Sequence, residues 1–101
     1  MNKQMLRQAQ ELQARLAKAQ EELANATVEG SAGGGAVKIV MNGHQEVQSV
    51  KISPEAVDPQ DVALLEDMVL AAFKDAFAKA QDLAQKRMAS ITGGLKIPGL
   101  M

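Results

Sequence analysis

The chain has 101 residues, of which 47% are apolar and 23% charged, and this length and composition predict one soluble domain. It has no cysteine and one histidine, which excludes a disulfide framework, a thiolate zinc site, a cysteine nucleophile and any site that needs two histidines. No apolar run approaches the ~20 residues that cross a bilayer, and the first ten residues lack the apolar stretch of a secretory signal. We therefore expect a cytoplasmic protein without a membrane partner.

Residues 2–26 are predicted to form one long amphipathic helix. Good helix formers fill most positions, and no glycine or proline interrupts the segment. Apolar residues recur at alternating spacings of four and three, which gives a narrow stripe with a period of about 3.5 residues. We call this stripe the apolar seam, and its members are Met5, Ala9, Leu12, Leu16, Ala19, Leu23 and Ala26. A seam this narrow predicts packing against one partner.

Residues 27–52 change to the pattern of strands and predict a small antiparallel meander. Segments 27–30 and 37–41 are the first two strand candidates. Asn42-Gly43 predicts a two-residue type I′ hairpin turn, which needs positive φ at both positions. Segment 47–52 is the third candidate, and the inconsistent parity of its apolar residues predicts a strand that is either bulged or apolar on both faces.

The glycine-rich run GSAGGG at residues 30–35 lies between the first two strand candidates. A phosphate-binding P-loop needs a Lys-Ser or Lys-Thr pair after its last glycine, followed by a helix. Here Ala36-Val37 and a strand follow, and the dinucleotide-binding pattern fails for the same reason. The run therefore predicts a flexible turn or a bulge between strands.

Residues 58–91 predict one long helix or two helices separated by a bend. Asp58 is the expected N-cap, with Pro59 at the first helical position and Asp61 in the first turn. No glycine or proline follows until the Gly-Gly pair that ends the pattern. Residues 92–101 are expected to form a flexible tail.

Two long helices and three short strands differ in length, so the helices are predicted to overhang the sheet. A sheet that is apolar on both faces cannot cover itself in a chain this short, which buries only about 60–65% of its surface on folding. The sequence thus predicts an α+β homodimer, in which the second copy covers the open sheet face or an edge and the helix ends project as arms.

Charge is distributed unevenly, although the formal net charge is −1. The first 18 residues carry a net charge of +3, residues 44–67 carry −5, and residues 68–101 carry +3. Two basic ends therefore flank an acidic middle. Together these ends can form prongs that meet phosphate groups.

The first predicted helix carries its charges against its own dipole. Lys3 and Arg7 lie near the positive N-terminus, and Glu21 and Glu22 lie near the negative C-terminus. Each such placement costs roughly 0.3–1 kcal/mol when exposed. A local stability rule broken without visible compensation indicates a functional role, and the alternative is a solvated charged face.

No constellation of catalytic residues is recognisable. His44 has no Ser, Asp or Cys partner nearby in the sequence and is expected on the surface. Phe73 and Phe77 are the two aromatic residues, and their i, i+4 spacing predicts core packing, so a platform for stacking single-stranded bases is absent. An enzyme is the least favoured class, and we expect no cofactor, no metal and no small-molecule substrate.

Three segments closely resemble the YbaB/EbfC family of bacterial nucleoid-associated proteins. They are VEGSAGGGAVKIVMNG at residues 28–43, VKISPEAVDPQDVALLEDMVLAAFKDAFAKAQ at 50–81, and MASITGGLKIPGLM at 88–101. The resemblance covers nearly the whole chain. It implies one family domain over residues 1–101, a homodimer whose protruding helices are likened to tweezers, and a location in the nucleoid.

The resemblance also implies binding of duplex DNA with little or modest sequence preference. DNA contacts of the family are attributed to the helical arms, and the basic residues that fit here are Lys3, Arg7, Arg15, Lys18, Lys79, Lys86 and Arg87. These cations would contact backbone phosphates and release counterions, in a protein that organises the nucleoid and regulates genes. The alternative is a protein-interaction scaffold that docks a recombination or replication factor through the seam and the overhanging helices, with DNA binding incidental.

Overall fold

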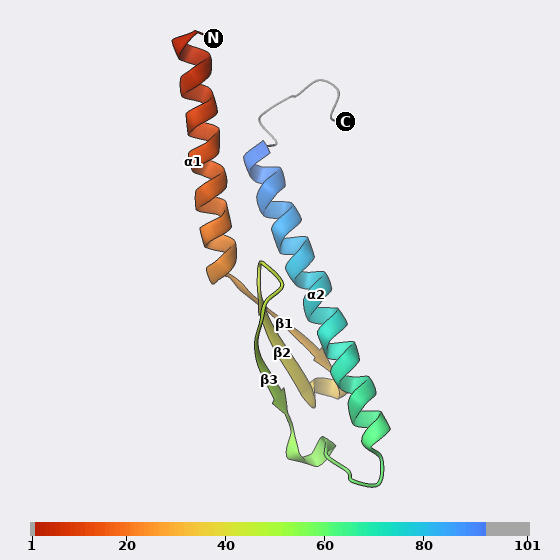
Figure 1. The fold of residues 1–101 in the computed structure, drawn as a ribbon. Helices are drawn as coiled ribbons and strands as arrows, with labels where there is room; N and C mark the ends of the chain where they lie inside the picture. Colours follow the sequence, from red (N-terminus) through yellow and green to blue (C-terminus); the bar gives the residue numbers. More distant parts are fainter. Residues whose placement is uncertain (1, 93–101) are drawn as a thin grey trace.

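The computed structural model describes residues 2–92 (Figure 1). The chain forms a long helix, a three-stranded antiparallel sheet and a second long helix, which confirms the predicted order and fold class. The predicted tail at residues 92–101 lies outside the described residues except for its first position. The elements are α1 (Lys3–Asn25), β1 (Thr27–Ala32), the short 3₁₀ helix η1 (Gly33–Gly35), β2 (Val37–Asn42), β3 (Val47–Ile52), the short 3₁₀ helix η2 (Pro54–Ala56) and α2 (Val62–Thr92).

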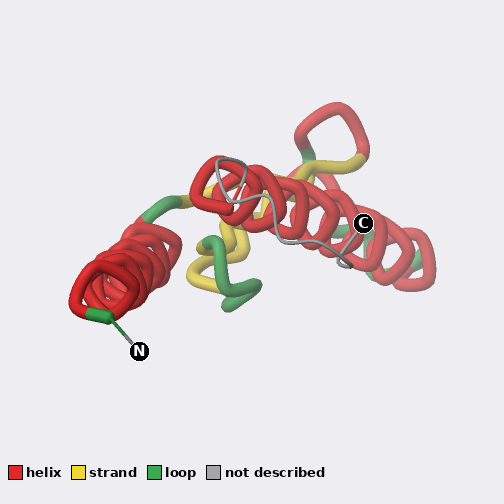
Figure 2. Tube along the Cα trace, turned by 90° about the horizontal axis from the view of Figure 1, so that it is seen from above, coloured by secondary structure: helices red, strands yellow, loops and turns green. Residues whose placement is uncertain are grey.

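The molecule is elongated. Its extents are 69 × 25 × 16 Å and its radius of gyration is 19.4 Å, against about 13 Å for a compact domain of this length. The reason is that α1 and the C-terminal half of α2 run beyond the sheet on the same side (Figure 1). Seen from above, α1 stands to one side of α2 and the strands (Figure 2). The predicted overhang of both helices is confirmed.

A small core joins one face of the sheet to α2. The strand order is β1-β2-β3, and alternate residues of the central strand point toward the helix. The fully or almost fully buried residues of this core are Val37, Ile39 and Met41 of β2 and Ala72, Ala76 and Ala80 of α2. Because the helix presents alanines to the sheet, its backbone comes close to the strands.

Gly30 is the point of closest approach between α2 and β1. A Cβ atom at this position would lie 2.3 Å from the carbonyl oxygen of Ala72 and 2.3 Å from the backbone nitrogen of Ala76. Gly30 therefore belongs to the strand, and the turn predicted from the glycine-rich run is limited to η1 and Ala36, with positive φ at all three η1 glycines.

The predicted two-residue turn at Asn42-Gly43 is wrong. The connection between β2 and β3 spans residues 43–46, and its positive φ of 63° is at Gln45. The Asn42 side chain organises this loop, because its Oδ1 accepts hydrogen bonds from the backbone N–H groups of His44 and Glu46. A glycine is needed at position 43 for a different reason, since a Cβ there would lie 2.8 Å from the carbonyl oxygen of Leu23.

The third strand contains the bulge that its sequence parity predicted. Val40 pairs with Ser49 and Met41 with Val47, which leaves Gln48 as the extra residue. Beyond the bulge, Val50 and Ile52 pair with core residues of β2 and so face the same side of the sheet as α2. The helix lies over β1 and β2, and these two side chains remain 50% and 39% exposed.

The second helix is one continuous helix of 31 residues, which decides between the single and the paired alternative. Its predicted N-cap was wrong. The Asp61 carboxylate accepts a hydrogen bond from the backbone N–H of Leu64, so Asp61 caps the helix, whereas the Asp58 carboxylate accepts from Gln60 N–H and stabilises the preceding turn. No helix within residues 2–92 is long and apolar enough to cross a membrane.

The contact at Gly30 generates a stability prediction. Gly30→Ala forces a methyl group against two helix backbone atoms, and we expect a loss of about 1–3 kcal/mol or more, measured as a lower urea midpoint. Gly34→Ala is the control, because it meets no atom within 4 Å and costs only about 1–2 kcal/mol for its left-handed backbone. A Gly30→Ala protein as stable as the wild type would contradict this packing.

Candidate nucleic-acid interface

Four of the predicted DNA contacts lie on the exposed arm formed by α1. They are Lys3, Arg7, Arg15 and Lys18. A helix turns by about 100° per residue, so these side chains fall within a sector of roughly 120° on the side away from the apolar seam. Glu11 lies within the same sector. Within residues 2–92, none of these four cations forms an ion pair.

The N-terminus of α1 concentrates positive charge. Asn2 is the N-cap, and its side-chain oxygen accepts a hydrogen bond of 2.7 Å from the backbone N–H of Met5. The first turn has no acidic residue and the last turn has no basic one. The helix dipole and the side chains of Lys3 and Arg7 therefore add at the tip of the arm, as the sequence predicted.

The three predicted contacts on α2 are in a different state, because each is already paired. Lys86 Nζ lies 2.9 Å from the Asp82 carboxylate, one helical turn away. The Arg87 guanidinium forms an ion pair with Glu22 of α1. Lys79 Nζ lies 3.1 Å from the Asp75 carboxylate. The structure thus brings α1 and α2 cations to the same side of the sheet, but it leaves only the α1 group without carboxylate partners among the described residues.

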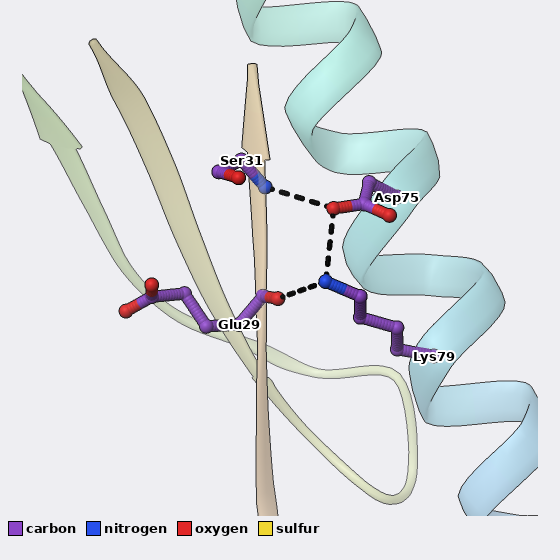
Figure 3. A network of polar contacts seen from close by, with 4 residues as sticks. All are labelled: Glu29, Ser31, Asp75 and Lys79. Carbon is purple, nitrogen blue, oxygen red and sulfur yellow. Dashed lines mark hydrogen bonds and ion pairs between the residues drawn. The ribbon is translucent and has the colours of Figure 1, made fainter. Parts of the chain in front are cut away.

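Lys79 also belongs to a polar clip between α2 and the edge of β1 (Figure 3). Its Nζ donates to the carbonyl oxygen of Glu29 at 2.9 Å, and the Asp75 carboxylate accepts from the backbone N–H of Ser31 at 3.0 Å. These backbone groups lie on the outer edge of the sheet, where a further strand would pair. The clip therefore occupies the free edge of β1, and Lys79 has a structural role.

Two hydrogen bonds stabilise the charged form of Asp75. The backbone N–H of Ser31 and, secondly, the ammonium of Lys79 lower the pKa of this carboxyl group below its ordinary value of 3.8. A depressed folded-state pKa contributes stability that is present above the ordinary pKa and is lost as the pH falls through the folded value.

Asp75→Asn tests the clip. We expect a lower urea midpoint than the wild type at pH 7, and a difference that shrinks as the pH falls below 3.8, where the wild-type carboxyl also becomes neutral. Asp82→Asn removes a carboxylate from the same helix whose only ion pair is the one with Lys86, and it should leave the midpoint nearly unchanged. A difference for Asp75→Asn that is constant from pH 7 to pH 3 would contradict the assignment.

The base of the α1 arm is fixed by the β2–β3 loop. Gly43 N–H donates to the carbonyl oxygens of Leu23 and Ala26, at 2.8 and 3.1 Å. The Asn42 side-chain amide contacts the Ala24 carbonyl oxygen at 3.2 Å, and His44 Nε2 lies 2.8 Å from the Gln20 carbonyl oxygen. The loop thus pairs the last carbonyl groups of α1, which otherwise lack partners.

Sequence reasoning missed this group of residues. His44 is exposed, as predicted, but it holds the arm, and nothing in its own sequence context indicates that contact. Glu22 was interpreted as a solvated charge, and its pairing with Arg87 depends on the packing of α1 beside α2. The one local signal was the Asn-Gly pair, which marked the loop and left its contact with α1 unseen.

Residues 1–95 match the YbaB/EbfC DNA-binding family, and the chain belongs to this family. A relative from Chloroflexus aurantiacus is 56% identical over 94 residues, which cover 93% of this chain and 94% of the relative. Another, from Pelotomaculum thermopropionicum, is 54% identical over 96 residues, covering 95% and 91%. Both are named nucleoid-associated proteins. The resemblance seen in the sequence is confirmed.

The fold is also that of an uncharacterized protein from Helicobacter pylori. The two structures superpose with a TM-score of 0.72 over 89% of this chain and 95% of the other, at 18% sequence identity. This similarity supports the fold alone. Membership of a DNA-binding family agrees with the expectation that the protein is not an enzyme.

Proposed function

We propose that this protein is a nucleoid-associated protein that binds duplex DNA as a homodimer and acts in nucleoid organisation and gene regulation. The single observation that carries the DNA-binding mode is the cluster of four α1 cations without ion pairs among residues 2–92, on one side of a projecting helix. The naming of the relatives as nucleoid-associated proteins supports the cellular role.

The contact set has an order that follows from the pairing of its members. Lys3, Arg7, Arg15 and Lys18 of α1 meet phosphates first, because no ion pair has to break. Lys86, with a side chain 77% exposed, and Arg87 are second, since each must exchange a carboxylate for a phosphate. Lys79 stays in the clip with β1. All these contacts are electrostatic, so binding is sensitive to salt and largely independent of sequence.

The proposed dimer uses the part of the sheet that α2 leaves open. Ile52 of β3 and Leu65, Val69 and Phe73 of α2 are among the residues that line a shallow apolar hollow of about 440 Å³. Val50, beside it on β3, is half exposed. Large exposed apolar patches mark protein interfaces, and the clip closes the β1 edge, so the β3 side is the free one for a second copy.

A salt titration tests the α1 contacts. If about four phosphates are neutralised, the slope of log affinity against log salt is near −3.6. The double variant Lys3→Gln/Arg7→Gln is expected to bind a short duplex more weakly and to lower the magnitude of this slope by about 1.8, since each lost contact removes about 0.9. Fluorescence anisotropy of a labelled duplex between about 50 and 200 mM salt covers the range in which such slopes are measured.

The matched control is Lys38→Gln/Lys51→Gln. It makes the same change in net charge, on two residues that pair across β2 and β3 in the sheet, and it should leave the slope unchanged. An equal effect of both double variants would mean that total charge and not the arm determines affinity, and no effect of either would reject the arm.

A scaffold for protein partners is the second candidate function, and the exposed apolar residues of α1 favour it. Met5 and Leu6 are 56% and 49% exposed near the tip of the arm. The same titration separates the two functions, because a scaffold with incidental DNA binding predicts equal slopes for the wild type and the Lys3→Gln/Arg7→Gln variant.

The dimer surface has its own test. Val50→Glu places a charge on the open apolar surface and is expected to reduce the mass measured by analytical ultracentrifugation from that of a dimer to that of a monomer. Ser49→Glu is the control, because this neighbouring residue points to the opposite face of the sheet. Identical masses for the wild type and both variants would exclude this surface as the interface.

A further inference from the structure

The apolar seam of α1 continues past the end of α2. Near the base of the arm, where the two helices lie side by side, seam residues Ala19 and Leu23 are 2% and 3% exposed. The Glu22–Arg87 ion pair marks the level of this contact. From Arg87, α2 runs only five more residues, about 8 Å, whereas α1 runs from Glu22 back to Lys3, about 28 Å. Roughly 20 Å of α1 therefore extends beyond the last described turn of α2 (Figure 1).

The seam on this free part of α1 has no cover among residues 2–92. Met5 is 56% exposed, and Leu12 and Leu16 are half-buried. Because the seam repeats every 3.5 residues, these side chains lie on the same helix face as Leu23 and so point to the side on which α2 lies. The uncovered strip therefore opens onto the space into which the chain continues after Thr92.

We propose that the segment after α2, GGLKIPGLM at residues 93–101, folds back over this strip and packs its apolar side chains on the seam. The two glycines that follow Thr92 permit a sharp change of direction. Three large apolar residues then follow at short intervals, Leu95, Ile97 and Leu100. Nine extended residues reach up to about 30 Å, which exceeds the roughly 16 Å between Leu16 and Met5 along α1.

The chain's own segment fits this strip better than the other occupants. DNA is excluded by chemistry, because the strip is apolar and the basic sector lies on the other side of α1. The surface proposed for a second copy lies along β3, at the opposite end of the molecule from the tip of α1 (Figure 1). A segment attached at Thr92 has an effective concentration in the millimolar range at the strip, without any partner. The inference does not depend on the proposed DNA contacts.

A disulfide-trapping experiment tests the inference in the full chain, which has no native cysteine. Leu12→Cys/Ile97→Cys joins the seam to the segment. Ala14→Cys/Ile97→Cys is the matched control, since position 14 is about 3 Å away along the axis but turned by about 160° to the opposite side of α1. We expect the first pair to form an internal disulfide about tenfold faster than the control, seen as a compact monomer on a non-reducing gel.

Two results would overturn the inference. One is an equal rate of internal crosslinking for the two pairs, and the other is a disulfide-linked dimer of Leu12→Cys/Ile97→Cys, which would assign the strip to a second copy. A measurement with single cysteines guards against a misfolded pair. The thiol of Leu12→Cys should react several-fold faster with Ellman's reagent when Leu95 and Ile97 are changed to serine, whereas the thiol of Ala14→Cys should not. An unchanged rate at position 12 would also contradict the docking.

Discussion

The contact of α2 with β1 at Gly30 is the constraint on which the rest of the structure depends. A hydrogen atom at Gly30 and methyl groups at Ala72 and Ala76 let the helix backbone lie directly on the strand. The helix is thereby centred on β1 and β2, where the Asp75–Lys79 clip holds it. One decision of packing thus produces a narrow body, an uncovered β3 and two helices that run past the sheet. Every surface assigned to a partner is a surface that this core leaves free.

The parts of the fold that were predictable are those set by local pattern. The alternation along residues 37–41 and the seam of α1 each state which face is buried, and a bulge in β3 was one of two alternatives given by its parity. The Asn42-Gly43 turn was mispredicted because its backbone is determined by the end of α1, about 20 residues earlier in the chain. The helix N-cap was misplaced by three residues because two aspartates compete there, and only hydrogen-bond geometry separates them.

The candidate site was predictable to the extent that it rests on charge and the helix dipole. Those two quantities identified Lys3 and Arg7 without any structure. They could not distinguish Lys18, which has no carboxylate partner in the described chain, from Lys79, which binds a strand carbonyl 50 positions away in the sequence. Arg87 was misjudged in the same way, since its partner Glu22 comes from another helix. Availability of a cation is a tertiary property, and sequence reports only its presence.

The anchoring of α1 has a mechanical consequence. The helix is fixed by the carbonyl groups of its last turns, through the loop of Asn42, Gly43 and His44, and its remaining length is cantilevered. A lever of about 35 Å converts each degree of rotation at the pivot into about 0.6 Å of travel at the tip. Small rearrangements among three hydrogen-bonding residues thus set the spacing between cations more than 20 Å away, which gives a rigid rod an adjustable span.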